Sequence, residues 1–539
     1  MIGFTLSPSQ MAPPLSLDIW CLILKNFKND RLTLHSCALV NRVLVTHAVM
    51  LLWSDPFDEN LSTRQVTALV NTLVSCLPNV SKPHLIRYGI ILPTAPQPHF
   101  NYPSFIKVLK LDQLSRGISR WITRYATVEV NSPFPGNPLI VFCAHLSAEI
   151  LRVVFVNCFL NKIAIKDSPW ISVLQDITPW AYVRCVQRIS ELHIARVDYN
   201  SRITNLIDLH NLSYLIKIWA SRCHEIRSLY IRVGEESQSF HEFLPKLVKA
   251  QDQLIKVHFS TGNNVLLIDK LLTALQSNTS LEEMDIFHTS LPNTFFHILS
   301  TCKVLSKLVL IGCKQHDQPL NLDLSSLHIT QFFCKNNIIH PENLRLVFSA
   351  ASTTLTTLIL DIAPLDVLST LSPRCRQLRH LVLGITSQPY DSIELLQDLQ
   401  NLEYLAFCHV SKRFVSTYHH DFYARLGPSL PIFLQHLHTE YIATPDDVMK
   451  FFKGCIAPIT ILGLNQPCGI NKFHLIVVCE FVRRKQFPLK ILQYDGSNKE
   501  YIIKSSNFPP EFLDSLKELL TLEVETLHPF DTDRWSYPR

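Results

Sequence analysis

The chain has 539 residues, of which 47% are apolar and only 18% are charged. This balance excludes an intrinsically disordered protein and favours a packed one, with several ordinary domains or one long repeat array. The 50 basic side chains exceed the 45 acidic ones by only five, and the densest basic run is RRK at residues 483–485, so no nucleic-acid partner is expected.

The cysteine pattern and the start of the chain favour an intracellular protein. The fifteen cysteines are scattered without Cys-x-x-Cys spacing, which predicts buried, reduced thiols and a cytoplasmic or nuclear location. Residues 1–14 contain prolines but no basic segment followed by a long apolar core, so we expect a disordered tail and not a signal peptide. Apolar runs such as residues 473–482 are too short for a transmembrane helix, and we expect no membrane partner.

Residues 15–57 show the pattern of three short helices. Ser16 can cap a first helix that has apolar side chains at every fourth position. Asp30 can cap a second helix, and a third is expected over residues 43–53, where it ends before the next proline.

Residues 58–145 are expected to form a helical and proline-rich region that leads into a repeat array. Apolar side chains at helical spacing predict a helix over residues 63–77. Six prolines between residues 78 and 103 predict little regular structure there, and a helical pattern resumes over residues 105–125.

The form apolar-x-x-apolar-x-apolar recurs from residue 146 onward. Its copies begin at Leu151, Ile189, Ile226, Leu254, Leu281, Leu305, Leu355, Leu378, Leu402 and Leu434, and a degenerate copy begins at Leu327. Most steps between copies fall in or near the 20–29-residue period of leucine-rich repeats. Each copy would be a short strand whose apolar side chains face inward and are buried when neighbouring copies stack.

These patterns predict an α/β fold with two parts. Three N-terminal helices would be followed by a leucine-rich-repeat solenoid over residues 146–525, with parallel strands on the concave side and helices on the convex side. Helices are expected, for example, over residues 265–275 and 292–300, and residues 526–539 would be a C-terminal tail. The alternative is an ordinary α/β domain, which the chain supports less well because it has only 13 glycines and no phosphate-binding turn.

Residues 15–53 resemble the F-box pattern. That pattern opens with Leu-Pro-x-Glu-Ile, continues with Ile-x-x-x-Leu and Leu-Val-x-Arg, and closes with Leu-Trp. The corresponding parts here are LSLDI at 15–19, Ile23 with Phe27, LVNR at 39–42 and LW at 52–53. Ser16 stands where the family usually has Pro, and Leu44 stands where it usually has Trp. The segments LWSDPF at 52–57, TLVSCLP at 72–78 and FNYPSFIKVLKL at 100–111 also look like a large group of fungal F-box proteins with degenerate leucine-rich repeats.

The resemblance implies a substrate-recognition subunit of a Skp–cullin–F-box ubiquitin ligase, which is not itself an enzyme and needs no cofactor. The F-box would bind a Skp-type adaptor and, through it, a cullin, while the repeats would hold a protein substrate near the ubiquitin-charged enzyme. The alternative is a leucine-rich-repeat scaffold for protein interactions without ligase function. The expected adaptor contacts are Leu15, Ile19, Ile23, Leu39, Val40 and Trp53, each of which could instead pack within the three helices.

The residues between the inward positions of the repeat would point to the concave face. In the middle copies this set is mixed in chemistry, which suits a protein or peptide ligand better than a nucleic acid. The expected substrate-binding residues are Tyr230, Arg232, Lys256, His258, Glu283, Asp285, Phe287 and Lys307. The alternative for each of them is a solvated side chain without a partner.

Motifs for metal binding and catalysis are weak. His436, His438 and Glu440 alternate, so a strand would place them on one side, which is the arrangement of many metal sites. Because the sequence offers no evident fourth ligand, no metal site is predicted. The chain contains no HExxH, GxSxG, P-loop or GxGxxG motif, and no cysteine lies in a recognisable nucleophile motif, so no catalytic residue is predicted.

Overall fold

The computed structural model of the protein divides into two compact units, which we describe separately. Unit 1 comprises Met1–Tyr230 and Glu242–Gln251, and unit 2 comprises Ile231–His241 and Asp252–Arg539. The structure describes residues 16–40, 42–88, 90–92, 98–125, 127–128, 138–166, 185–195, 206–234, 240–315, 323–361, 374–384, 390–408, 421–441, 443–464, 472–483 and 491–494. Leu15 and the two predicted tails, 1–14 and 526–539, lie outside these residues.

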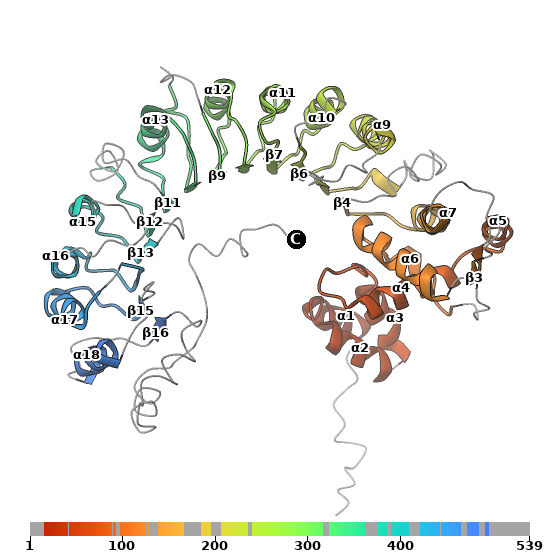
Figure 1. Ribbon diagram of the computed structural model, residues 1–539, viewed down its shortest axis with the longest axis horizontal. Helices are drawn as coiled ribbons and strands as arrows, with labels where there is room; N and C mark the ends of the chain where they lie inside the picture. Colours follow the sequence, from red (N-terminus) through yellow and green to blue (C-terminus); the bar gives the residue numbers. More distant parts are fainter. Residues whose placement is uncertain are drawn as a thin grey trace, which may run out of the picture. The chain divides into compact units, whose positions relative to one another are not determined.

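Unit 1 begins with three short helices, α1 (Leu17–Asn26), α2 (Arg31–Val40) and α3 (Arg42–Leu52) (Figure 1). The predicted caps are confirmed. The hydroxyl of Ser16 accepts a hydrogen bond from the Ile19 amide at 3.5 Å, and Oδ1 of Asp30 accepts one from the Thr33 amide at 3.0 Å.

The three helices have a hydrophobic core of their own. Each helix contributes one buried leucine to it, namely Leu24, Leu34 and Leu44. Burying each of these side chains is worth about 1.5–3 kcal/mol. Around this trio pack five partly buried side chains, those of Trp20, Phe27, Cys37, Leu51 and Leu52.

The segment after α3 ties the three helices to the rest of unit 1. The carbonyl of Ser54 accepts hydrogen bonds from the amides of Lys107 and Val108, both at 2.9 Å. Asp55 pairs with Lys110 at 3.1 Å between Oδ2 and Nζ, and Phe57 is fully buried. The helical module is thus attached through backbone bonds, an ion pair and apolar packing.

The next elements of unit 1 follow the prediction in part. They are α4 (Thr63–Ser75), α5 (Ser81–Arg87), β1 (Ile90–Ile91), η2 (Tyr102–Phe105), β2 (Val108–Lys110), α6 (Leu111–Tyr125), β3 (Thr127–Val128) and α7 (Pro138–Asn157). Helix α4 confirms the predicted helix over 63–77 and begins with a capping box between Ser62 and Gln65. The helical pattern over 105–125 is α6, but a 3₁₀ turn and a short strand precede it.

The first predicted repeat strand is wrong. Leu151 and Val154 belong to helix α7, and the strand follows the helix as β4 (Lys162–Lys166), which the pattern missed. The reason is geometric, since two apolar residues three apart also share one face of a helix. After β4, unit 1 continues with β5 (Glu191–Ala195), α9 (Leu206–Arg222), β6 (Ser228–Arg232) and α10 (Phe240–Lys249). The last two residues of β6 and the first two of α10 belong to unit 2.

Unit 2 is a regular succession of parallel strands and helices. Its strands are β7 (Lys256–Ser260), β8 (Glu283–Phe287), β9 (Lys307–Ile311), β10 (Gln331–Lys335), β11 (Thr357–Leu360), β12 (His380–Gly384), β13 (Tyr404–Cys408), β14 (His436–Thr439), β15 (Ile461–Leu464) and β16 (Ile491–Tyr494), each hydrogen-bonded to the next. Its helices are α11 (Val265–Leu275), α12 (Thr294–Thr301), α13 (Pro341–Ala351), α15 (Tyr390–Leu396), α16 (Phe422–Ser429), α17 (Pro445–Gly454) and α18 (Lys472–Arg483).

The predicted strands of unit 2 are confirmed, including the degenerate copy after Leu327, which is β10. Strand β15 was missed, although Ile459, Leu462 and Leu464 repeat the pattern. Within unit 2 the strands line the inner side and the helices the outer side (Figure 1), so the chain is α/β with a solenoid-like arrangement. Among the helices that the structure describes, none is both long and apolar enough to cross a membrane.

The core of unit 2 lies between the strands and the helices. Two side chains of each strand from β7 to β15 face it, for example Leu308 and Leu310 in β9, which are almost completely buried. The residues that alternate with them face the inner, concave side of the sheet. Because all pairs are parallel and in register, equivalent concave residues of successive strands form rows across the sheet.

Candidate interaction surfaces

The three N-terminal helices expose large apolar side chains that their core does not use. Ile19 on α1 is 43% exposed, and Leu39 and Val40 at the end of α2 are 75% and 80% exposed. Leu22 and Leu32 are exposed as well. Such a concentration of exposed apolar side chains on a small module is typical of a protein interaction site.

The six predicted adaptor contacts differ in their surroundings. Ile19, Leu39 and Val40 are exposed and Ile23 is half-buried. Trp53 is buried, with its ring centroid 4.5 Å from that of Tyr102 in η2, so it packs within unit 1. Internal packing, the alternative for each contact, therefore applies to Trp53.

Four exposed apolar residues of the module were missed from the sequence, namely Leu17, Leu22, Leu32 and Met50, and two of them lie at helical spacing from predicted contacts. Leu32 precedes Leu39 by seven residues, so both lie on one face of α2. Leu22 follows Ile19 by three residues on α1. Helical spacing from the predicted contacts could have identified both.

A second surface lies on the concave side of β7, β8 and β9 in unit 2. The register places Lys256, Glu283 and Lys307 in one cross-strand row. The carboxylate of Glu283 lies between the two lysines, with Oε2 2.8 Å from Nζ of Lys256 and 3.5 Å from Nζ of Lys307. The next row pairs His258 with Asp285, and Nδ1 of His258 lies 3.9 Å from Oδ2 of Asp285.

The charges of this surface largely compensate one another. Asp285 also lies 3.7 Å from Lys256, so two carboxylates face two ammonium groups. Burial lowers the pKa of His258 to about 4, and the nearby Lys256 and Arg232 act in the same direction against the opposing effect of Asp285. His258 is therefore neutral at pH 7, and the surface offers positioned donors and acceptors without a large net charge.

Aromatic rings border the charged rows. The ring of Phe287 is 4.3 Å from that of His258, and Nζ of Lys307 lies 6.0 Å from the centre of the Phe333 ring. Six of the predicted substrate-binding residues are thus brought together in unit 2. Arg232 is exposed in the same unit, whereas Tyr230 belongs to unit 1, where its ring lies 3.9 Å from that of His193.

The row that begins at His258 and Asp285 continues through apolar side chains to β14. Its members are Val309, Phe333, Ile359, Val382 and Ala406, and the next position is His438. His438 of β14 and Glu440, which follows the end of this strand, lie on the same side of the chain, as the sequence predicted. His436 is not part of the group around them and instead contacts Tyr404, with ring centroids 4.4 Å apart.

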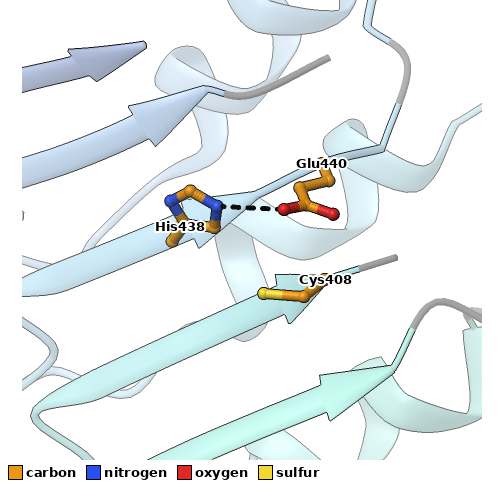
Figure 2. A group of neighbouring side chains, drawn as sticks. All are labelled: Cys408, His438 and Glu440. Atoms are coloured by element: carbon orange, nitrogen blue, oxygen red, sulfur yellow. Dashed lines mark ion pairs between the residues drawn. The ribbon is translucent and has the colours of Figure 1, made fainter. Parts of the chain in front are cut away.

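Cys408 of β13 completes this group, which Figure 2 shows. Its thiol lies close to the His438 ring and the Glu440 carboxylate, and all three residues are buried. Cys408 was not predicted to belong to this group, because its proximity depends on the register of β13 and β14, which the local pattern does not encode.

Comparison with known protein families and with curated proteins finds no matching family model and no significantly similar protein.

Proposed function

We propose that this protein is the substrate-recognition subunit of a Skp–cullin–F-box ubiquitin ligase. In this proposal α1–α3 bind a Skp-type adaptor, and through it a cullin, while the concave surface of β7–β9 binds a protein substrate. The protein carries out no chemistry itself, since tethering alone raises the concentration of substrate lysines at the transfer site.

The observation that carries the adaptor part is the separation of core and surface in the three-helix module. The core trio is buried, while Ile19, Leu39 and Val40, all within the F-box-like motif, project into solvent. An exposed Leu-Val pair at the end of a helix is unfavourable unless a partner covers it.

The two departures from the F-box pattern are compatible with an intact module. Ser16 replaces the usual Pro but caps α1 with its hydroxyl. Leu44 replaces the usual Trp and is only 6% exposed, because it fills the core between the helices. Neither residue reduces the exposed apolar area at Leu39 and Val40.

The substrate part of the proposal depends on unit 2 being an array of leucine-rich repeats. Side-chain hydrogen bonds typical of such stacked repeats support this. In that repeat, Asn or Cys stands three residues after the last apolar strand position. Cys313 and Asn337 occupy this position after β9 and β10. The Asn337 amide donates to the Leu310 carbonyl at 2.7 Å and accepts from the Cys313 amide at 2.6 Å, and the Cys313 thiol donates to the Ile286 carbonyl at 3.3 Å.

The test is co-purification of a Skp-type adaptor with the full chain and with the double variant Leu39→Asp/Val40→Asp. Both side chains are exposed, so the variant should fold, whereas two buried charges at the interface should weaken adaptor binding at least about tenfold. Val80→Asp, at an equally exposed apolar residue outside the three helices, is the matched control and should bind normally.

Equal adaptor recovery with the double variant would contradict the proposed contact. Failure of the unchanged chain to bind the adaptor would favour the second candidate, a repeat scaffold without ligase function. Point variants are preferable to removing the first 59 residues, because Trp53 and Phe57 are buried within unit 1 and their loss would disturb its packing.

A further inference from the structure

We propose that Cys408, His438 and Glu440 form a binding site for a divalent transition-metal ion, with Zn²⁺ as the best match. This inference is independent of the ubiquitin-ligase proposal. Three observations support it: the placement of three ligand types, the buried His438 ring whose nitrogens have no hydrogen-bond partner, and the distances between the ligand atoms.

Two adjacent parallel strands bring the three residues together (Figure 2). Ala406 pairs with His438 and Phe407 with Thr439, so the next step along the strands places Cys408 beside Glu440. One ligand atom from each residue lies within 4.8 Å of the others. The site is therefore built on the ends of two strands that are held in register by backbone hydrogen bonds, which is a rigid support for ligands.

The imidazole of His438 is the strongest single indication of a ligand site. Its side chain is 1% exposed, and within the described part of the chain neither ring nitrogen has a hydrogen-bond partner. A buried polar group without a hydrogen bond costs about 1–3 kcal/mol. A metal ion at Nε2 would remove this cost for one of the two nitrogens.

The spacing of His438 and Glu440 suits a metal better than a direct bond. Their Nε2 and Oε1 atoms are 3.7 Å apart, which is too long for a hydrogen bond. A nitrogen and an oxygen ligand at zinc bond lengths of about 2.0–2.2 Å and a tetrahedral angle are about 3.3–3.5 Å apart. The observed separation exceeds this range by only about 0.2 Å.

The chemistry of the ligand set points to zinc among the common metals. A thiolate, an imidazole and a carboxylate are each established zinc ligands, and together they leave the fourth tetrahedral position for water or an added ligand. The thiol of Cys408 would lose its proton on binding, so that thiolate and carboxylate together neutralise the charge of the ion.

Gly463 on the next strand makes room for the histidine. It pairs with His438, and a methyl group at this position would overlap the imidazole ring. The ring is thus confined between β13 and β15, which restricts the directions in which its nitrogens can point.

Lys335 offers an alternative way to compensate the buried carboxylate of Glu440. Its positive charge acts on both Cys408 and Glu440, so it could balance the carboxylate without any metal.

The experiment uses the full chain, freed of metal by a chelator and titrated with Co²⁺ as the spectroscopic probe. We expect one equivalent to bind with a thiolate-to-cobalt charge-transfer band, and Zn²⁺ to displace it. Cys408→Ser should abolish the band, and His438→Asn should weaken binding by more than about 100-fold, since changes of outer-sphere partners alone cost 10–100-fold.

Two variants serve as matched controls. His436→Asn changes the neighbouring histidine of the same strand, and Cys375→Ser changes another buried thiol of unit 2; both should keep the band and the affinity. Circular dichroism shows which variants fold, and the stoichiometry and band of the unchanged chain decide the question even if a variant does not fold. An unchanged chain that binds no Co²⁺ under these conditions, or a Cys408→Ser variant that keeps the band, would overturn the proposal in favour of charge compensation by Lys335.

Discussion

His258 is almost fully buried on the concave side of β7, next to Lys256 and the carboxylate of Asp285. Burial makes its protonated form unfavourable, and the two basic neighbours Lys256 and Arg232 add to this effect. His436 on β14 has its pKa lowered to about 4 for the same main reason. In the unfolded chain both side chains would take up a proton near pH 6.5.

This difference predicts that the protein loses stability in mild acid. Because the folded-state pKa of His258 lies below the unfolded value, the unfolded chain binds more protons between pH 6.5 and about 4, so stability falls as the pH decreases through this window. The loss of unfolding free energy that is due to His258 should reach roughly 2–3 kcal/mol at pH 4.5. Denaturant unfolding at several pH values measures it.

His258→Asn should flatten the dependence of the unfolding free energy on pH, while His297→Asn, at an exposed position on α12, should leave it unchanged. An identical pH dependence in all three proteins would show that His258 does not carry the effect.

The helices and strands owe their positions to different interactions. Helices α1 and α4 begin at side-chain caps that are visible in the sequence, namely Ser16 and the Ser62–Gln65 capping box. The strands have no such local signals at their ends and are held by register with their neighbours. Gly463 illustrates this dependence, since the space it leaves is filled by His438 of the adjacent strand.

Gly463→Ala should therefore destabilise unit 2 by about 1–3 kcal/mol, the usual cost of overpacking. Gly234→Ala is the control, because a methyl group there meets nothing within 4 Å. It should be neutral or slightly stabilising, since alanine restricts the unfolded chain more than glycine does. The denaturant midpoints of the two variants provide the comparison, and equal midpoints would mean that the His438 ring has room to move away.

At the scale of the whole chain, two kinds of core coexist. The leucine trio stabilises only α1–α3, whereas the core of unit 2 is continuous from one repeat to the next. In such an array each repeat contacts only its neighbours. The loss of stability caused by a core substitution is therefore expected to remain in the neighbouring repeats.

Hydrogen exchange can test this locality. Leu44→Ala removes about 2–5 kcal/mol of packing from the three helices and should raise exchange in residues 17–52, but not in strands β7–β9. Leu308→Ala should have the reverse effect, with faster exchange in β8–β10 and no change in α1–α3. An increase spread evenly over the whole chain in either variant would show that the two cores unfold together.

The sequence by itself determined the parts of this protein that depend on local periodicity. The caps of α1 and α2, the strands from β5 to β14 and the helix over 265–275 follow from spacing and propensity along one segment. For Leu151 and Val154 the same spacing fits a helix and a strand, and the interpretation failed there because both structures can bury two apolar residues three apart.

Only the tertiary structure decided which distant residues meet. Trp53 is buried because Tyr102 packs against it, although these residues are far apart in the sequence. Leu39 and Val40 are exposed although they lie on the same helix as Leu34, which is buried in the core of the three helices. Cys408 joins His438 and Glu440 through the register of β13 and β14. Register and packing arise from contacts between segments, and a pattern within one segment does not contain them.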